Sequence, residues 1–361
     1  MTSIVILGAG KIGAAIAQLL GDAGDYTITI ADSSPERLDR ISIKNLEKAS
    51  VDAHNLQSLK TLLDGRDIVI SALPFFLNVA VAEIAAKLGL HYFDLTEDIT
   101  TTRKIKKIAK SAKSVMMPQC GLAPGFVGIV ARELARTFDE LETVRMRVGA
   151  LPQFPTNALK YNLTWSTDGL INEYCNPCEA IVEGAQREVL PLEGYEEFAL
   201  DGVRYEAFNT SGGLGTLCET LEGRVYNLDY KTVRYPGHRD LIKMLVDDLR
   251  LSNRRDLLKD VLETAIPMTL QDVVLVFVTI SGIKNGRLTQ ESFARKIYGK
   301  EISGKLWSAI QVTTAAGACG AIDLVVNGTL PGRGFVRQED IALDDLLDGR
   351  FGQYWSQETK G

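Results

Sequence analysis

Six residues near the start of the chain have types and a spacing that suit the phosphates of a dinucleotide. Gly8-Ala9-Gly10-Lys11-Ile12-Gly13 follows a short β-branched run and opens a helical pattern. In such a turn the first glycine permits the tight bend, the second lets the backbone approach a pyrophosphate, and the third allows close helix–strand packing. The N-terminus of the next helix offers free N–H groups to the phosphates. The glycine spacing alone is a weak signal, but this context predicts a dinucleotide site.

An acidic residue, Asp32, stands about twenty residues beyond this turn, at the end of the second predicted strand. A carboxylate at that place accepts hydrogen bonds from ribose hydroxyls and repels a 2′-phosphate, so we expect NAD as the cofactor. Arg37 lies one helical turn further on and keeps NADP open, because a guanidinium binds phosphate well. A strand–turn–helix without any cofactor is the simpler alternative.

Other strand ends are expected to complete the cofactor cleft, because ligands bind beyond the carboxyl ends of parallel strands. Asp52 and Ala53 follow the third strand and are expected near the adenine. The segment after the fourth strand is expected to follow the pyrophosphate and the nicotinamide ribose. The predicted cofactor residues at these strand ends are Ser33, Asp52, Ala53, Ser71, Ala72, Leu73 and Pro74.

The elements that must position these residues alternate between strand and helix over the first part of the chain. Apolar runs predict strands at 3–7, 27–31, 49–52, 67–72, 91–94 and 114–118. Apolar residues at helical spacing predict helices at 12–20, 35–41, 56–63, 78–88 and 103–112. This alternation is typical of a doubly wound parallel sheet, so we predict an α/β Rossmann domain.

The pattern changes beyond Pro124, which is expected to begin a helix over 123–138. Candidate strands at 144–148, 151–156, 160–165, 180–183, 187–190 and 230–234 indicate a mixed sheet, and Lys284-Asn285-Gly286 marks a hairpin after 272–282. An Ala- and Gly-rich helix over 307–326 is expected to return to the first domain, with the tail from Asn327 running over the surface. We therefore predict a Rossmann domain over 1–124 with a return over 307–361, and a second α/β domain over 125–306.

Composition excludes several classes of protein. The 361 residues are 45% hydrophobic and 24% charged, which argues against wholesale disorder, and the net charge of −6 argues against nucleic acid or an anionic membrane as partner. The apolar run 273–280 is too short to span a bilayer, and no signal peptide is visible before the first strand. Five cysteines do not suggest a disulfide framework, and Cys175-Asn176-Pro177-Cys178 lacks the second pair that a structural zinc needs. We expect a cytoplasmic protein without a metal.

Five segments together resemble one known family. They are the glycine turn, 91–95 (HYFDL), 121–125 (GLAPG), 208–213 (FNTSGG) and 231–238 (KTVRYPGH). With these the chain is similar, over nearly its whole length, to the saccharopine dehydrogenase family, and most closely to its lysine 6-dehydrogenase branch. The resemblance implies a Rossmann domain, an α/β substrate domain, and hydride transfer from a lysine-derived amine to a nicotinamide cofactor.

One departure favours a branch of that family. Saccharopine-forming relatives usually carry Asn-Arg-Asp-Ser where this chain has Asn209-Thr210-Ser211. An arginine there suits the extra carboxylates of saccharopine, since its planar fork binds carboxylate bidentately. Its absence favours a substrate with one α-carboxylate, such as lysine, and Arg234 is the candidate that binds it. A structural ion pair is the alternative role of Arg234.

The chemistry that the resemblance implies also needs a general base. A hydride leaves only from a neutral amine, whereas a lysine ε-ammonium with a pKa of about 10.4 must first lose a proton. Asp94, at the end of the fifth strand, is the first candidate, expected to be partly exposed and to relay the proton through Glu97 or His238. His238 is the second candidate.

The function predicted from these observations is oxidative deamination of the ε-amino group of lysine, or of a related amine, with NAD. A saccharopine dehydrogenase, a carboxyalkyl-amine reductase and a non-catalytic nucleotide sensor remain alternatives. We expect a homodimer or higher homo-oligomer and a small amino acid as substrate. The residues expected to line the substrate site are Phe75, Glu97, Gly121, Leu122, Pro124, Gly125, Thr210, Ser211 and Arg234.

Overall fold

The structure is a computed structural model of the chain and describes residues 1–44 and 46–356. Its contacts divide the chain into two compact units. Unit 1 comprises residues 1–126 and 313–355, and unit 2 comprises residues 127–312 with Ser356. These divisions lie beside the boundaries expected at 124/125 and 306/307.

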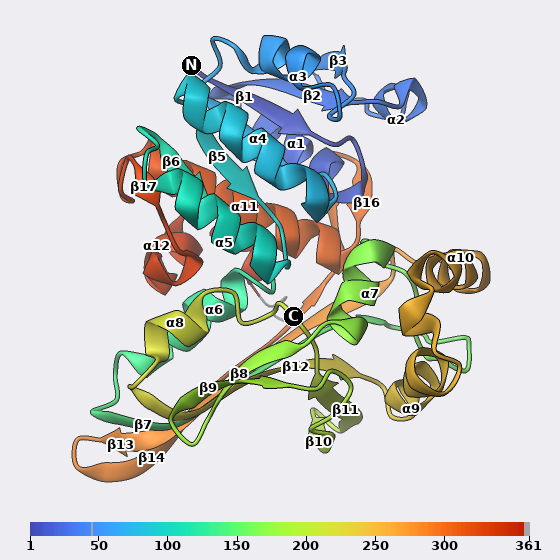
Figure 1. Cartoon of the computed structure of the whole chain (residues 1–361), viewed down its shortest axis with the longest axis vertical. Coiled ribbons are helices and arrows are strands. Elements are labelled where there is room, and N and C mark those ends of the chain that lie inside the picture. Colours follow the sequence, from blue (N-terminus) through green and yellow to red (C-terminus); the bar gives the residue numbers. More distant parts are fainter. Residues whose placement is uncertain (45, 357–361) are drawn as a thin grey trace. The chain divides into compact units, whose positions relative to one another are not determined.

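Unit 1 is built on a seven-stranded sheet in the order β17-β6-β5-β4-β1-β2-β3. Every neighbouring pair is parallel, as predicted for a Rossmann domain (Figure 1). The strands are β1 (Thr2–Leu7), β2 (Tyr26–Asp32), β3 (Leu46–Ser50), β4 (Ile68–Ser71), β5 (His91–Asp94), β6 (Val115–Met117) and β17 (Gly334–Phe335). All four residues of β4 are buried, which explains why this central strand reads as one apolar run.

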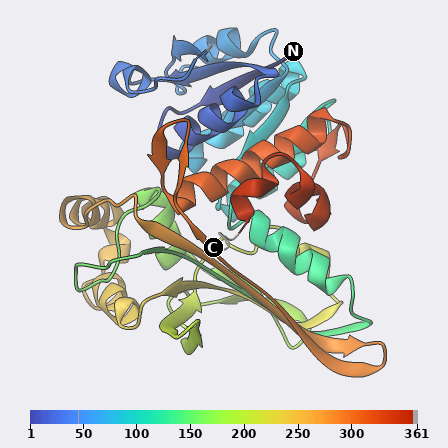
Figure 2. The same ribbon diagram turned by 180° about the vertical axis from the view of Figure 1, so that it is seen from behind.

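Helices cover both faces of this sheet. Side chains of α3 (Leu56–Leu63), α4 (Phe75–Leu88) and α5 (Ile99–Ala109) share one core cluster with alternate residues of β1, β4, β5 and β6. The other face carries α1 (Lys11–Ala23) and α11 (Ala309–Val326), which Figure 2 shows from behind. The Cys319 thiol of α11 lies 3.9 Å from the Ile16 carbonyl of α1, so these two helices pack side by side. The short α2 (Pro35–Asp39) follows β2.

Two expectations for unit 1 were wrong. The third strand runs over Leu46–Ser50 rather than 49–52, because it is a largely exposed edge strand whose polar sequence carries no alternating pattern. The tail does not run over the surface: β17 pairs with β6, and the buried Trp355 ring stacks on Phe126 with ring centres 3.7 Å apart. This tail also contains α12 (Leu343–Asp348) and two short 3₁₀ helices, Gln338–Asp340 and Gly352–Trp355.

Unit 2 contains an eight-stranded mixed sheet, as predicted. The main order is β10-β11-β12-β7-β13-β14, with β8 pairing β12 and β9. Only β12 and β7 are parallel among the described pairs of this sheet. The strands are β7 (Glu140–Pro152), β8 (Cys178–Val182), β9 (Ala185–Val189), β10 (Glu196–Leu200), β11 (Val203–Asn209), β12 (Val225–Arg234), β13 (Asp272–Lys284) and β14 (Arg287–Tyr298).

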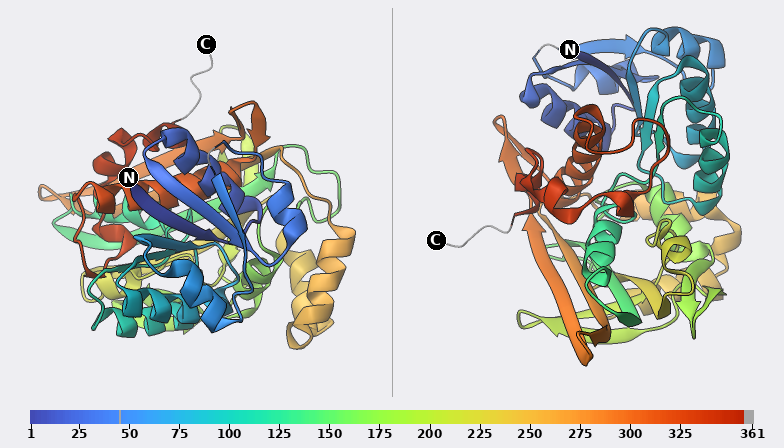
Figure 3. Two further views of the ribbon diagram at one scale, coloured as in Figure 1. Left: turned by 90° about the horizontal axis from the view of Figure 1, so that it is seen from above. Right: turned by 90° about the vertical axis from the view of Figure 1, so that its left-hand side faces the viewer.

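The predicted hairpin is confirmed. β13 and β14 pair along their whole length up to Lys284 opposite Arg287, and Figure 3 shows them as one long ribbon. Asn285 and Gly286 both have positive φ, at 52° and 71°, as a two-residue turn between twisted strands requires. A second, two-stranded sheet follows, made of β15 (Lys300–Ile302) and β16 (Lys305–Trp307).

The helices of unit 2 were mostly not predicted. They are α6 (Phe126–Ala135), α7 (Thr167–Cys175), α8 (Leu217–Leu221), α9 (His238–Lys243) with a π-helical turn to Asp248, a 3₁₀ turn at Leu251–Asn253, and α10 (Arg255–Ala265). α6 begins at Phe126 rather than at Pro124, because the Gly121 carbonyl accepts from the Phe126 N–H and closes a separate turn first. Residues 160–165 form a loop rather than a strand; Lys160 has a φ of +49° there.

Among the described helices, α11 is long and apolar enough to cross a membrane by length and composition. Most of its side chains are buried against the rest of the protein, which is the pattern of a core helix.

Candidate functional site

The glycine turn has the geometry that a dinucleotide requires. Gly8 has a φ of +101°, which favours glycine, and a Cβ on Gly13 would lie 1.9 Å from the Gly8 carbonyl oxygen. A Cβ on Gly10 would meet no atom within 4 Å, so the backbone is open at the glycine that must approach the phosphates. Lys11 and Ile12 begin α1, whose first N–H groups belong to this turn. The chain's own residues therefore fit a bound pyrophosphate.

Asp32 connects the end of β2 to the glycine turn. Its Oδ2 accepts from the Ala9 N–H at 2.8 Å and its Oδ1 from the Ser34 N–H at 2.8 Å, and only 5% of the residue is exposed. The Arg37 guanidinium is 61% exposed and lies 3.7 Å from the same carboxylate. Asp32 is thus held rigidly, whereas Arg37 can turn toward solvent or toward a phosphate. Ser33 is exposed between them.

The other predicted cofactor residues follow β3 and β4 at the same edge of the sheet. Asp52 and Ala53 lie in the turn before α3, where the Asp52 carboxylate accepts from the His54 N–H. The Ser71 hydroxyl is buried and donates to Asn78 Oδ1 at 2.7 Å. The segment between β4 and α4 is partly exposed and consists of Ala72, Leu73 and Pro74; α4 begins at Phe75. The parallel topology brings all of them to the carboxyl edge of one sheet.

Asp94 occupies the end of β5 but differs from the expected general base. It is 0% exposed, and its carboxylate accepts from the Tyr92 hydroxyl at 2.6 Å and from the Thr96 and Gln119 N–H groups at 2.9 Å. Burial raises the pKa of Asp94 to about 6. The expectation of a partly exposed Asp94 was wrong, because its own loop and the segment after β6 close over it.

The loops beside Asp94 contain the predicted Glu97 and the Gly121–Gly125 turn. Glu97 is half-buried, while the neighbouring Asp98 accepts from the Thr101 N–H and so caps α5. Gly121, Leu122, Pro124 and Gly125 are all buried, and the Gly121 N–H donates to the Pro124 carbonyl. A Cβ on Gly317 of α11 would lie 2.8 Å from the Gly121 carbonyl oxygen. The turn therefore packs inside unit 1.

Arg234, at the end of β12 in unit 2, is a buried cation. It is 3% exposed, and its Nε donates to the Tyr174 hydroxyl at 3.0 Å and its Nη1 to the Val233 carbonyl at 2.9 Å. The guanidinium carbon lies 4.8 Å from the centre of the Tyr161 ring. Within the described residues no carboxylate stands within 4.0 Å of it. The buried Glu173 carboxylate acts on Arg234 through its charge from beyond that distance, so the guanidinium is partly compensated within the fold.

His238 helps to hold Arg234 through Tyr174. The imidazole is 0% exposed, with Nε2 3.0 Å from the Tyr174 hydroxyl and Nδ1 2.8 Å from the Leu159 carbonyl. Burial, followed by the neighbouring Arg234 charge, lowers the pKa of His238 to about 3. The neutral ring therefore donates from Nδ1 to Leu159 and accepts at Nε2 from Tyr174. As placed, His238 orients a hydroxyl and has no solvent route for a proton.

Thr210 and Ser211 lie in the loop after β11 in the same unit. The Thr210 and Thr232 hydroxyls are 2.7 Å apart and buried, and the Ser211 N–H donates to the Glu173 carbonyl at 3.0 Å. The loop is thereby joined to β12 and to α7, the elements that carry Arg234 and Tyr174.

Sequence reasoning missed several residues that surround Arg234 and His238. Tyr174 lies in no recognisable motif, and the sequence does not show whether Tyr161 belongs to the core or to a pocket. Glu206 on β11 is 1% exposed and accepts from the Gly237 and Arg239 N–H groups at 2.7 and 2.6 Å, which fixes the turn that begins α9. No spacing in the sequence indicates these contacts, because they join segments far apart in the chain.

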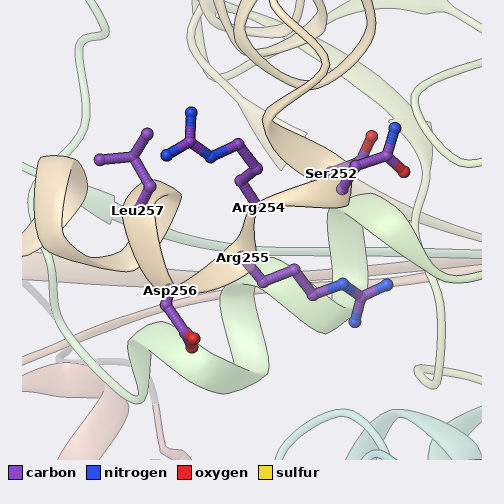
Figure 4. A pocket seen from close by; sticks show the side chains of 6 residues that line it. Ser252, Arg254, Arg255, Asp256 and Leu257 are labelled. Carbon is purple, nitrogen blue, oxygen red and sulfur yellow. The ribbon is translucent and has the colours of Figure 1, made fainter.

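A surface hollow at the start of α10 contains none of the predicted residues. Ser252, Arg254, Arg255, Asp256 and Leu257 line it (Figure 4). The Arg255 guanidinium already donates to the Asn172 and Asn176 side chains, at 3.0 and 2.7 Å. We assign it no ligand. In residues 1–44 and 46–356, no three His, Cys, Asp or Glu side chains form a group that could hold a metal ion.

Comparisons with known proteins give matches over most of the chain. The family model "Saccharopine dehydrogenase NADP binding domain" matches residues 4–140, and the model "Saccharopine dehydrogenase C-terminal domain" matches residues 121–349. The saccharopine dehydrogenase (L-Glu forming) of Saccharomyces cerevisiae has a similar structure, with a TM-score of 0.79, 18% identity, and 98% of each chain covered. At that identity the likeness concerns the fold.

Curated relatives are similar at low identity. The mitochondrial alpha-aminoadipic semialdehyde synthase of Mus musculus is 24% identical over 62% of this chain and 27% of its own length. The saccharopine dehydrogenase [NADP(+), L-glutamate-forming] of Pyricularia oryzae is 24% identical over 68% of this chain and 57% of its own. The carboxynorspermidine synthase of Vibrio cholerae is 27% identical over 39% of this chain and 42% of its own. The chain thus spans less than two thirds of each of these relatives.

Proposed function

Because the chain belongs to the saccharopine dehydrogenase family, we propose that it is an NAD(P)-dependent oxidoreductase that acts on lysine or a lysine-derived amine. The preferred reaction is oxidative deamination of the lysine ε-amino group. Loss of a hydride from the ε-carbon and a proton from the nitrogen leaves an imine, which water converts to the semialdehyde and ammonia. The observation that carries this proposal is the buried Arg234 guanidinium, whose Nε donates to the Tyr174 hydroxyl and which has the charge of Glu173 near it but no carboxylate within ion-pair distance in the described residues.

Arg234 supports a substrate with one α-carboxylate. The buried Arg147 of unit 2 is already paired with Glu196 and Asp229, and Lys231 is paired with Glu196. The segment Asn209-Thr210-Ser211 adds no further cation beside the cluster. A substrate with three carboxylates, such as saccharopine, would leave two of them without a matching guanidinium in this cluster. Lysine, with one, fits better.

The residues of the glycine turn and β2 would hold the nicotinamide dinucleotide, which supplies the hydride acceptor when bound. The rigid, buried Asp32 supports NAD as the preferred cofactor, because its fixed carboxylate disfavours a 2′-phosphate. The exposed Arg37 beside it supports some use of NADP. The family model describes an NADP-binding domain, so this preference needs a direct measurement.

The proton of the substrate ammonium needs an acceptor. Asp94 and His238 were proposed for this role, but the first accepts from three donors and the second stays neutral inside an aromatic cluster. Glu97 and Asp98 are both half-exposed on the loop after β5, but Asp98 already caps α5 by accepting from the Thr101 N–H. We propose that Glu97 or solvent receives the proton, and that Asp94 holds the loop in place.

A carboxyalkyl-amine reductase or saccharopine dehydrogenase is the second candidate, favoured by the names of the relatives. A non-catalytic nucleotide sensor is the third. The test is cofactor reduction with lysine, saccharopine and carboxynorspermidine side by side, with NAD and with NADP. Saturable turnover of lysine is expected. Turnover of saccharopine alone would favour the second candidate, and cofactor binding without any turnover would favour the third.

The cytoplasmic location and a homo-oligomeric state remain predictions of this proposal. Light scattering coupled to size-exclusion chromatography measures the mass in solution. A single species with the 39.5 kDa mass of the chain would contradict the oligomer.

A further inference from the structure

Gln119, two residues beyond β6 in unit 1, has a backbone φ of +69°. Residues with a side chain rarely adopt this left-handed conformation, and one that does is held there by its surroundings. The Gln119 N–H donates to Asp94 Oδ1 at 2.9 Å, and the Cys120 N–H donates to the Asp94 carbonyl at 2.8 Å. On the other side, the Pro118 carbonyl accepts from Gln338 Nε2 at 3.2 Å. The backbone at Gln119 is therefore fixed by bonds on both sides.

The side chain of Gln119 is not satisfied in the same way. The residue is 3% exposed, and its Nε2 has no hydrogen-bond partner in the described part of the chain. A buried donor without a partner costs the full desolvation penalty of the group, so native structures keep few of them. Glycine would suit this backbone and an apolar side chain would remove the unpaired donor. A glutamine here therefore needs an explanation other than packing.

Gln119 stands at the end of a hydrogen-bond network along the carboxyl edge of the parallel sheet. The Ser71 hydroxyl, at the end of β4, donates to Asn78 Oδ1 at 2.7 Å. The Tyr92 hydroxyl donates to Asp94 Oδ2 at 2.6 Å and lies 3.4 Å from the Asn78 carbonyl. The other oxygen of Asp94 accepts from the Gln119 N–H. The donors named in this network all have acceptors, whereas Gln119 Nε2 has none.

The order of the strands indicates which half of a dinucleotide lies beside Gln119. The glycine turn follows β1, which stands between β2 and β4 in the order β17-β6-β5-β4-β1-β2-β3. Asp32, at the end of β2, is on the side where the adenosine ribose is expected. Gln119 follows β6, on the opposite side of β1. A dinucleotide with its pyrophosphate at the turn extends its nicotinamide half toward that side.

We propose that the Gln119 amide binds the carboxamide of the nicotinamide ring, with Nε2 donating to the carboxamide oxygen. The oxygen of a carboxamide is a strong acceptor, which is what the buried Nε2 lacks. The contact would limit rotation of the ring about its glycosidic bond. The inference rests on the proposed function and deepens it, because it names the residue that recognises the reactive end of the cofactor. Asp94 keeps the positioning role proposed above.

A buried water is the competing explanation, because water also satisfies isolated polar atoms. Gln119→Met separates the two explanations, since methionine has a similar length and no amide. If Nε2 is reserved for the cofactor, the substitution leaves the free protein as stable or more stable and weakens cofactor binding. If Nε2 binds a structural water, the substitution destabilises the free protein and leaves cofactor binding unchanged.

The first measurement is therefore the thermal stability of Gln119→Met without ligand. We expect its melting temperature to equal or exceed that of the wild type. Gln338→Met is the matched comparison, because Gln338 is 5% exposed and its Nε2 donates to the Pro118 carbonyl at 3.2 Å and lies 3.0 Å from Cys120 Sγ. Loss of these bonds should lower the melting temperature. Gln57→Met, at an exposed glutamine of α3, should change nothing.

The second measurement is binding by isothermal titration calorimetry, with NADH and NADPH as probes. The dissociation constant of the cofactor that binds the wild type more tightly should rise about fivefold or more in Gln119→Met, because the carboxamide oxygen loses its donor. ADP-ribose and its 2′-phosphate, which lack the nicotinamide ring, should bind the wild type and the variant equally. Gln57→Met should bind all four ligands as the wild type does.

A third probe tests which atom of the cofactor is recognised. The reduced 3-acetylpyridine analogue of the cofactor has a ketone in place of the carboxamide, so it keeps the oxygen and lacks the amide N–H groups. Because the proposed contact uses the oxygen, Gln119→Met should weaken the binding of this analogue by about the same factor as it weakens the binding of the cofactor.

Four results would overturn the inference. They are equal cofactor affinity in the wild type and Gln119→Met, an equal loss of affinity for ADP-ribose, an acetylpyridine analogue that binds both proteins equally, and a melting temperature lowered as in Gln338→Met. Failure of the proposed function is seen separately, as a wild type that binds the cofactor but turns over no amine. A loss of affinity in Gln119→Met that is confined to ligands with the ring would then still support the contact.

Discussion

Asp94 in unit 1 and Arg234 in unit 2 are both charged side chains buried at a strand end, yet their surroundings differ. The Asp94 carboxylate accepts three hydrogen bonds from its own unit. The Arg234 guanidinium donates to one hydroxyl and one carbonyl and has no carboxylate within 4.0 Å in the described part of the chain. Burial is the same in both cases, but the kind and number of hydrogen-bond partners differ.

This difference separates a structural role from a binding role. A buried charge that finds all its partners within the fold fixes the fold, because removing it leaves those partners unpaired. A buried charge that lacks a direct ion-pair partner can gain further compensation from a bound ligand of opposite charge. On this comparison we propose that Asp94 holds the loops after β5 and β6, and that Arg234, which Glu173 compensates in part, binds a substrate anion.

The largest expected effect is on Arg234. Arg234→Lys should raise the KM for lysine by about 100-fold or more, because an ammonium cannot reproduce the planar fork, while kcat falls less. Steady-state kinetics with lysine measures both constants. Arg145→Lys, an exposed arginine on β7, is the control and should behave as the wild type. A variant with normal kinetics and lowered stability would make Arg234 structural, like Asp94.

The second effect concerns Asp94 and appears in stability. Asp94→Asn should destabilise the protein by about 1–3 kcal/mol, because the amide keeps some of the three contacts and loses the rest. Its kcat should follow the folded fraction. A loss of kcat by about 10²–10⁴-fold in fully folded protein would instead identify Asp94 as the general base. Denaturant unfolding and steady-state kinetics, measured on the same preparation, distinguish the structural role of Asp94 from the catalytic one.

The pH dependence of this variant sharpens the comparison. The pKa of Asp94 is about 6 in the folded protein and 3.8 ordinarily, so the folded state holds the proton more tightly. The stability that this proton contributes is present below pH 3.8 and is lost as the pH rises to about 6. Asp94→Asn lacks it. The destabilisation by the substitution should therefore be largest near pH 4 and smaller by pH 7, and a difference that is constant across this range would contradict the raised pKa.

A third and smaller effect is expected at His238. His238→Gln places a carbonyl where Nε2 accepts from Tyr174, so the KM for lysine should rise only about threefold to tenfold. The acidic limb of the kcat/KM profile should remain, because an imidazole with a pKa of about 3 does not titrate near neutrality. Loss of that limb would restore His238 as a candidate base.

The smallest effect concerns the cofactor turn, where Asp32 resembles Asp94 in accepting backbone N–H groups and Arg37 is exposed. Arg37→Ala should lower kcat/KM for NADP by a few fold, about what an exposed ionic contact contributes, and leave the value for NAD unchanged. Asp32→Ala should reduce the preference for NAD, at some cost in stability because the Ala9 N–H loses its acceptor. A wild type that already prefers NADP would contradict the assignment of Asp32.

The sequence by itself predicted unit 1 well, because local signals repeat there. Apolar runs separated by helical patterns indicate a parallel sheet. The glycine turn is also a local feature: a Cβ on Gly13 would lie 1.9 Å from the Gly8 carbonyl oxygen, and a Cβ on Gly10 would meet no atom within 4 Å. The hairpin turn at Asn285-Gly286 was equally local. The sequence did not predict the helices α7, α9 and α10, because they lie between irregular loops whose conformation depends on contacts with distant segments.

The roles of the site residues were decided by tertiary structure. The sequence could place Asp94, His238 and Arg234 at strand or helix ends and assign them charged chemistry. It could not show that Tyr92, Thr96 and Gln119 converge on Asp94, or that Tyr174 connects His238 with Arg234 across 60 residues. Whether a buried charge is compensated depends on atoms brought together by folding, and no residue type or spacing along the chain contains that information.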